Sequence, residues 1–243
     1  MKLQSIVGIA CGVALVSGLV GAVSGFRMAD SYEASGRKTA TIVSSLRQHM
    51  TADMMHDSLR GVVFRSLYAV SIHDKEMARD AQEDLQKSAK TFRDAIEAQQ
   101  KLDLPQSIRD ALAKVRAPLN DYVQSAEKLV ALGVAGKEAE AKAALPAFHV
   151  SFSTLEKEMA ETSDSIEKAS AAETETAAEL GRLSMLLNWI MLGLAAVLFT
   201  GYFILCRVFV TGPLAGTTRS MIALAEGNLE EGTAIRSRIS EIA

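Results

Sequence analysis

Two long apolar segments without a charged side chain enclose a charged central segment. The first covers residues 5–26 and the second covers residues 183–206. A helix rises about 1.5 Å per residue, so about 20 such residues cross a hydrocarbon layer of about 30 Å. A chain that crosses twice has residues 27–182 on one side of the membrane and residues 207–243 on the other. The layout therefore predicts a membrane protein with two transmembrane helices.

The basic residues beside the apolar segments indicate the orientation of the chain. Lys2 precedes the first segment and Arg207 follows the second, whereas Arg27 weakens the contrast on the other side. The positive-inside rule assigns the more basic flanks to the cytoplasm. We expect a multi-pass protein of a bacterial inner membrane, with residues 1–4 and the C-terminal tail cytoplasmic and the central segment periplasmic.

The first apolar segment also has features of a cleaved signal peptide. Lys2 supplies a positive start, and the string Ala22-Val23-Ser24 offers small residues for a cleavage site. The apolar stretch is longer than the apolar part of a usual signal peptide. This length favours an uncleaved span over a cleaved signal.

The composition of the central segment favours helices and shows no catalytic motif. It is rich in Ala, Glu, Lys and Gln, which are strong helix formers. The whole chain has a net charge of -3, which disfavours binding to nucleic acid. The two cysteines, Cys11 and Cys206, both lie in the apolar segments, so no disulfide is expected in the central segment. We expect a protein that is not an enzyme, with no catalytic residue and no cofactor.

Apolar residues of the central segment recur at alternating steps of three and four, which is the period of packed helices. The rhythm breaks at Asp74, a candidate N-cap, at Pro105, and at the two glycines of residues 133–136. These breaks delimit helices at residues 27–73, 74–103, 105–133 and 137–182. Short turns make neighbouring helices antiparallel, so the fold expected is all-α, with an antiparallel four-helix bundle between the two spans. The expected core residues of the last three helices are Leu85, Ala89, Phe92, Ile96, Ile108, Leu112, Val115, Leu119, Tyr122, Ala126, Leu129, Phe148, Phe152, Leu155, Met159 and Ile166.

The first helix of the bundle has ionisable residues where its core should be. The same rhythm gives the series Ile42, Leu46, His49, Asp53, His56, Arg60, Val63, Leu67 and Val70. Burying four such groups without partners costs several kcal/mol, so they must be paired, hydrated or bound to a ligand. We take His49, Asp53, His56 and Arg60 as a candidate ligand-binding segment.

Three interpretations of this segment remain open. In the first, this face turns to water and Met50, Met54, Phe64 and Tyr68 form the core seam instead. In the second, Arg60 and its neighbours line a ligand site or a dimer interface. In the third, His49, Asp53 and His56 bind a metal, with nearby methionines favouring copper. Three ligands in one row of a helix rarely complete a coordination sphere, so we expect no metal site.

The tail carries a short pattern of its own after the second apolar segment. Pro213 and Leu214 come first, Gly227 and Leu229 follow, and Glu241 begins the string Glu-Ile-Ala. The pattern resembles the start of a HAMP signal-relay module, which opens with Pro-Leu, has a Gly-x-hydrophobic connector and starts its second helix at an acidic residue. The resemblance implies a signal-relay role for these five residues and only a partial HAMP domain in residues 207–243.

The tail departs from the HAMP pattern at a few positions. Thr217 and Thr218 stand where a larger apolar residue is usual, and Ser240 and Ala243 stand where Asp and Gly are usual. Two successive small polar residues weaken the apolar stripe of the first HAMP helix. The position of the pattern directly after a predicted span still favours the HAMP interpretation.

Span, bundle, span and HAMP together resemble the N-terminal part of a bacterial methyl-accepting chemotaxis protein. Residues 54–61 also resemble a segment of sensory bundles in that family. The resemblance implies a homodimer that binds a small molecule or a protein in the periplasm and transmits the event to the HAMP module. A kinase and an adaptor would be partners only through a further cytoplasmic part, to which no residue of this sequence can be assigned.

Two other functions share these features. The sensor half of a membrane histidine kinase has the same bundle, spans and HAMP module. A small membrane protein that acts by helix association alone would need no output domain. The identity of the ligand is not encoded in any motif of the sequence.

Overall fold

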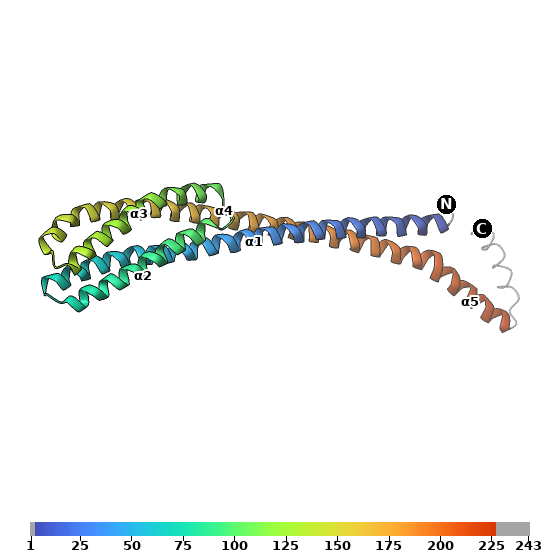
Figure 1. Cartoon of the computed structure of the whole chain (residues 1–243). Coiled ribbons are helices and arrows are strands. Elements are labelled where there is room, and N and C mark those ends of the chain that lie inside the picture. The colour runs from blue at the N-terminus through green and yellow to red at the C-terminus, as the bar shows by residue number, and fades with distance from the viewer. Residues whose placement is uncertain (1–2, 227–243) are drawn as a thin grey trace. The chain divides into compact units, whose positions relative to one another are not determined.

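Residues 3–226 are described by the computed structural model, and every regular element in this range is a helix (Figure 1). The prediction of an all-α chain is confirmed. The elements are α1 (Leu3–Ser71), α2 (Lys75–Gln100), α3 (Gln106–Val134), α4 (Glu138–Cys206), the π-helix η1 (Arg207–Thr211) and α5 (Gly212–Ala225). Within the described residues the chain divides into a central unit, residues 31–179, and a terminal unit, residues 3–30 and 180–226.

The turns of the central unit lie where the sequence predicts breaks. Asp74 caps α2, because its Oδ1 accepts hydrogen bonds from the backbone amides of Glu76 and Met77, each at 3.0 Å. Before it, His73 has a φ of 60°, an unusual left-handed conformation for a residue with a side chain. At the other turn Gly136 has a φ of 69°, and Lys137 N–H donates to the carbonyl of Leu132 at 2.9 Å. This is the pattern of a Schellman motif, in which a left-handed glycine ends a helix.

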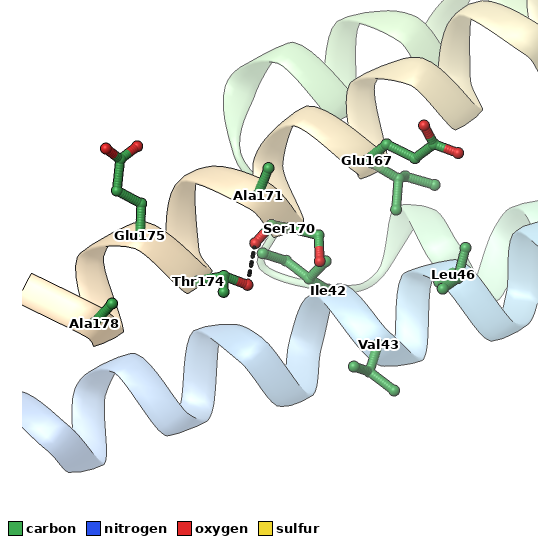
Figure 2. A pocket seen from close by; sticks show the side chains of 10 residues that line it. Ile42, Val43, Leu46, Glu167, Ser170, Ala171, Thr174, Glu175 and Ala178 are labelled. Atoms are coloured by element: carbon green, nitrogen blue, oxygen red, sulfur yellow. Dashed lines mark hydrogen bonds between the residues drawn. The ribbon is translucent and has the colours of Figure 1, made fainter. Parts of the chain in front are cut away.

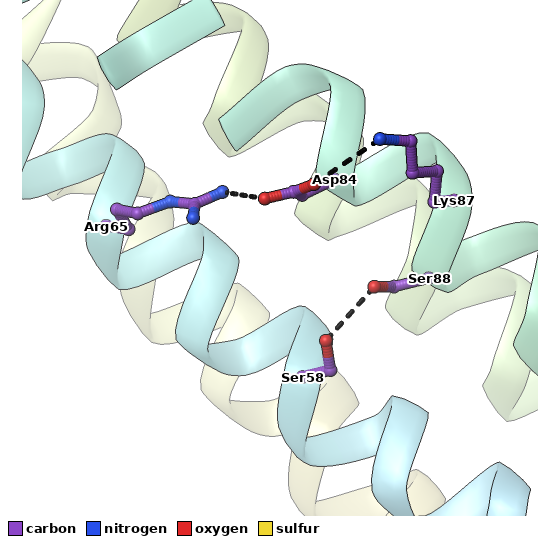
Figure 3. Close-up of polar contacts among 5 residues, drawn as sticks. All are labelled: Ser58, Arg65, Asp84, Lys87 and Ser88. Atoms are coloured by element: carbon purple, nitrogen blue, oxygen red, sulfur yellow. Dashed lines mark hydrogen bonds and ion pairs between the residues drawn. The ribbon is translucent and has the colours of Figure 1, made fainter. Parts of the chain in front are cut away.

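Neighbouring helices of the central unit run antiparallel. Between α1 and α2, Ser58 and Ser88 lie 3.0 Å apart and Arg65 pairs with Asp84 at 2.6 Å, as Figure 3 shows. Lys87 lies 3.9 Å from the same carboxylate. Between α3 and α4, a Ser125–Ser151 hydrogen bond of 2.7 Å and a Lys114–Glu161 pair of 3.3 Å repeat the arrangement. In both pairs, higher residue numbers on one helix face lower numbers on the other.

The core of the central unit contains side chains from α1, α2, α3 and α4. All core positions that the sequence predicted for the last three helices are buried. A second apolar cluster, around Leu104 and Ile108, lies beside the turn between α2 and α3. Pro118 and Pro146 lie inside α3 and α4, which continue through both residues.

The predicted core series of α1 is wrong at every second position. The seam observed in the structure consists of Ile42, Ser45, His49, Ala52, His56, Leu59, Val63, Ser66 and Val70. It shares Ile42, His49, His56, Val63 and Val70 with the prediction and shifts the remaining positions by one residue. Small residues therefore replace Leu46, Asp53 and Leu67 in the seam, and helices can approach closely there.

Gly133 of α3 shows how close the approach is. A Cβ atom added to Gly133 would lie 2.2 Å from the Oγ of Ser66 on α1. Only a glycine allows α3 to lie this near to α1 without a displacement of that hydroxyl. The small residues of the α1 seam thus have matching small residues on the facing helix.

The terminal unit contains two helical stretches that are long and apolar enough to cross a membrane, one in α1 and one in α4. None of the residues in these stretches is buried. The two stretches contact each other where a Cβ atom on Gly21 would lie 2.8 Å from the terminal methyl of Met191. Large apolar side chains that are exposed along a whole helix, such as Leu15 and Val197, are typical of contact with lipid.

A π-helix separates the second apolar stretch from α5. Gly212 N–H donates to the carbonyl of Arg207, five residues earlier, instead of four. Pro213 follows directly and has no N–H for a helical hydrogen bond, so the regular α pattern cannot pass through this point unchanged. Short π-helices of this kind are frequent at functional sites.

Candidate functional site

His56 lies where all four helices of the central unit meet. It is 3% exposed, and its ring stacks on Phe152 of α4, with the centroids 4.1 Å apart and the planes 10° apart. The ring of Tyr122 on α3 lies 5.1 Å away, and that of Phe92 on α2 lies 6.4 Å away. An ionisable group is thus enclosed by three aromatic rings from three other helices.

Two hydrogen bonds fix the position of His56 in this aromatic cage. Its Nε2 lies 3.3 Å from the carbonyl oxygen of Phe152 and can donate to it. Tyr122 Oη donates to the carbonyl oxygen of His56 at 2.8 Å. Burial raises the pKa of the Tyr122 phenol, so this group stays a neutral donor.

His49 lies seven residues before His56, on the same face of α1. It is 7% exposed, and its Nδ1 is buried without a hydrogen-bond partner among the described residues. One turn earlier, Ser45 accepts two hydrogen bonds from the amide nitrogen of Gln99 on α2, at 2.9 Å to its hydroxyl and 3.1 Å to its carbonyl. The core of α1 is therefore polar over several turns.

Burial lowers the pKa of both histidines. For His49 the desolvation of the ring is the larger effect, and the Asp53 carboxylate opposes it. For His56 desolvation again dominates, against the hydrogen bond to Phe152 and the charges of Asp57, Glu156 and Asp53. Both imidazoles are consequently neutral at neutral pH.

The other two residues of the predicted segment lie outside the core. Asp53 is exposed. The Arg60 side chain is 44% exposed, pairs with Asp57 at 3.0 Å, and holds its guanidinium carbon 4.5 Å from the centre of the Phe152 ring. The structure therefore separates the four residues, with His49 and His56 inside and Asp53 and Arg60 on the surface.

A surface cavity of about 350 Å³ lies beside Arg60. Phe64 and Arg60 of α1 line one side, and Lys142 and His149 of α4 line the other, with Phe152 at its inner edge. Lys142 pairs with Glu138 at 2.6 Å, so the cations of this cavity are already partly neutralised. The cavity has room for a small molecule and contacts the ring on which His56 stacks.

A second groove, of about 580 Å³, lies between α1 and α4 on the central unit (Figure 2). Its α1 side has Ile42, Val43 and Leu46. Its α4 side has alanines together with Ser170 and Thr174, which are joined by a 2.8 Å hydrogen bond from the Thr174 hydroxyl to the Ser170 carbonyl. The groove is mostly apolar, with Glu167 and Glu175 at its rim.

The exposed side of α1 carries a row of large apolar side chains, which we name the outer stripe. Its members follow one another at helical spacing, with Asp57 and Gly61 in the gap. They are Val43, Leu46, Met50, Met54, Phe64, Tyr68 and Ile72. Three of them, Val43, Leu46 and Phe64, also border the groove and the cavity that α1 shares with α4. The interpretation in which Met50, Met54, Phe64 and Tyr68 form the core seam is wrong, because these residues are 50–66% exposed.

The three residues of the metal interpretation, His49, Asp53 and His56, do not form a cluster. Asp53 points away from the core that contains both histidines, and no group of three or more His, Cys, Asp or Glu in residues 3–226 could hold a metal ion. Of the predicted relay residues, Pro213 and Leu214 lie in α5. Gly227, Leu229 and Glu241 lie outside the described residues.

The sequence did not reveal the aromatic cage. Phe92, Tyr122 and Phe152 were predicted as core residues. Their common contact with His56 depends on how far the four helices are shifted along their axes relative to one another. A comparison of the chain with protein-family models, curated proteins and solved structures found no match.

Proposed function

We propose that this chain is the sensory module of a bacterial transmembrane receptor of the chemotaxis type. In this proposal the central unit is a periplasmic four-helix-bundle sensor, the two apolar stretches span the inner membrane, and α5 begins a cytoplasmic HAMP relay. The observation that carries the proposal is the continuity of α4 from Glu138 to Cys206. One helix thus includes both Phe152, beside His56, and the second apolar stretch.

A continuous helix supports transmission because a change in the packing of one part can pass along its backbone to the next part. A ligand that changes the packing of Phe148 or Phe152 changes the position of α4, and the same helix continues into the predicted span. Such a switch needs two arrangements of similar free energy and a ligand that prefers one of them. The polar core of α1 supplies a weakly stabilised packing of this kind, since Ser66 Oγ, His49 Nδ1 and Gln99 Oε1 are buried without partners among the described residues.

The junction after the second apolar stretch supports the relay role. The five-residue π-helix η1 interrupts the α-helical hydrogen bonds directly before α5, and Gly212 and Pro213 are the first two residues of α5. A change in α4 can be absorbed or passed on by a shift between π and α hydrogen bonding at this point. Pro213 and Leu214 are the relay residues of this proposal that lie in the described part of the chain.

The outer stripe supports a homodimer. Burying one large aliphatic or aromatic side chain contributes about 1.5–3 kcal/mol, so a stripe of seven exposed ones favours association. Two copies anchored in one membrane are parallel, and steps of three and four residues suit a second helix in parallel packing. The occupant we propose for the stripe is α1 of a second copy.

The intact mass of the native product, isolated from its own membranes, tests the proposal. A mass well above 26.0 kDa is expected, because a receptor of this type needs an output part beyond the HAMP relay. Sequencing that part separates the chemoreceptor from the sensor kinase, by a long heptad repeat or by a phospho-accepting His helix. A native mass near 26.0 kDa would contradict the proposal and favour a protein that acts by helix association alone.

A further inference from the structure

His49 and His56 are the two buried histidines of the described residues, and both belong to α1. The other two histidines of the chain, His73 and His149, are exposed. His49 and His56 lie one heptad apart on the seam by which α1 packs against the rest of the core. Any change in their charge therefore acts on one helix interface.

The surroundings of His49 oppose a positive charge. A protonated imidazole carries two N–H donors, yet Nδ1 of His49 already lacks a partner in the folded state. On α1 the nearby charge is Asp53, which is exposed and one turn away. On α2 the amide of Gln99 is engaged by Ser45 and offers no charge. A proton on His49 would leave a buried donor and a buried charge with poor compensation.

The surroundings of His56 are mixed. The charged groups near it are Asp53, Asp57 and Arg60 on the exposed side of α1 and Glu156 on α4. Its direct neighbours are the Phe92 ring on α2, the neutral Tyr122 on α3 and the Phe152 carbonyl on α4. The rings of the cage and the carbonyl can stabilise an imidazolium to some degree. Arg60, over the same Phe152 ring, opposes a second positive charge there.

We propose that the proton is a ligand of the central unit, bound by His49 and His56, and that its binding loosens the packing of α1 against α2, α3 and α4. This inference rests on the proposed receptor function and supplies its stimulus. Neutral imidazoles hold α1 in the packing observed in the structure. Protonated imidazoles are stabilised when α1 shifts, because they then reach water and the Asp53 and Asp57 carboxylates on the exposed side of the same helix.

The sign of the pH dependence follows from the lowered pKa values. Stability from the two neutral rings is fully present above about 6.5, the ordinary pKa of histidine. It is lost as pH falls from there through the lower values of the folded state, because the unfolded chain binds the protons more readily. Acidification is thus the stimulus, and neutral pH is the resting condition.

Selective labelling tests the proton site directly. The full chain, in lipid nanodiscs and with ¹⁵N only in its four histidines, is titrated from neutral to acidic pH by NMR. Spectra of His49→Asn and His56→Phe variants assign the two buried rings. We expect both rings to titrate below the ordinary histidine value of about 6.5. Titration of both rings at or above that value would overturn the proposal.

A distance measurement tests the movement of α1. Spin labels are placed at Val43→Cys on α1 and Ala171→Cys on α4, two residues that line the groove of Figure 2. The native Cys11 and Cys206 of this chain are replaced by serine. We expect the distance distribution to lengthen or broaden between pH 7.5 and pH 5. The His73→Asn control, at an exposed position in the turn before α2, should retain the change.

The decisive comparison is with a chain that cannot bind the proton. In the His49→Leu, His56→Leu double variant the pH-dependent change in distance should disappear. If this variant does not fold, His49→Asn with His56→Phe takes its place, since Asn is polar and Phe suits the aromatic cage. The proposal would be overturned if the wild-type distance did not change with pH. It would also be overturned if the distance changed equally in the wild-type chain and in the double variant. The native mass of the product is independent of this result, so the receptor proposal can survive it.

Discussion

The inner and outer faces of α1 differ less in apolar character than the two faces of a helix in a packed domain usually do. The inner seam mixes large apolar residues, such as Leu59 and Val63, with small or polar ones, such as Ser45, His49 and His56. The outer stripe contains large aliphatic and aromatic side chains. Apolar burial is the main favourable contribution to packing, so the inner face of α1 contributes less than its length suggests. The comparison indicates that the free chain leaves a second apolar face of α1 uncovered. It fits a helix with small and polar positions in its packing against the rest of the central unit and a second surface for another copy.

The largest effect should come from a matched pair of phenylalanines on the two surfaces. Phe152, 4% exposed, should lower the free energy of unfolding by about 3–5 kcal/mol when replaced by alanine. Phe64, on the outer stripe and 50% exposed, should lower it by no more than about 0.5 kcal/mol under monomeric conditions. Chemical denaturation of dilute protein in detergent, followed by helical circular dichroism, measures both. If both substitutions lowered the free energy of unfolding equally, Phe64 would be part of the core and the distinction between a buried and an exposed surface would be wrong.

Self-association should respond in the opposite way. Met54→Glu removes an apolar contact and brings two negative charges together in a parallel pair, so the dimer dissociation constant should rise at least tenfold, or about 1.4 kcal/mol. Val150 on α4 is also exposed and apolar but lies off the stripe, and Val150→Glu serves as the control. Sedimentation in detergent compares the two variants. An equal effect of both substitutions would argue against the outer stripe as the dimer interface.

The inner face should make stability depend on pH. Between pH 7.5 and pH 5.5 the melting temperature should fall as the pH falls, because burial lowers the pKa of His49 and His56. His49→Leu should reduce the slope, since its ring no longer titrates. Asp84 and Glu138 also have lowered pKa values, but their contributions are lost below their ordinary values of 3.8 and 4.5. A slope unchanged by His49→Leu would show that this histidine does not control the response.

The smallest effect concerns the close approach of α1 and α3. Gly133→Ala adds helix propensity but places a methyl group against the Ser66 hydroxyl, so the two effects should nearly cancel. In a Ser66→Ala background, where that oxygen is absent, the same substitution should stabilise by about 0.5–1 kcal/mol. A double-mutant cycle of unfolding free energies gives the coupling. Additive effects would mean that the two residues do not contact each other in solution.

The sequence predicted most of the helices because local signals marked them. Asp74 caps α2, the glycines near residue 136 end α3, and the apolar rhythm of α2, α3 and the central part of α4 identifies their buried faces. In α1 the rhythm was wrong at every second position, because large apolar residues also form the outer stripe and small residues take part of the seam. Periodicity identifies an apolar face but does not say which partner covers it.

The candidate site was predicted only in part for a related reason. His49 and His56 were identified because they are common to both possible registers of the seam. Asp53 and Arg60 belong to the wrong register and lie on the surface. In the aromatic cage, residues 92, 122 and 152 contact His56 from three other helices. The positions of these residues along the helix axes are set by turn lengths and tertiary packing, which no local sequence pattern contains.

The most direct test of the account is cysteine cross-linking along α1 in native membranes. Single cysteines at Met50, Met54 and Tyr68 on the outer stripe are compared with one at Val150, in a chain without Cys11 and Cys206. We predict that mild oxidation joins two copies through the stripe positions and not through position 150. No cross-linked dimer at any stripe position, or equal cross-linking at position 150, would contradict a helix with a sensing face inside and a pairing face outside.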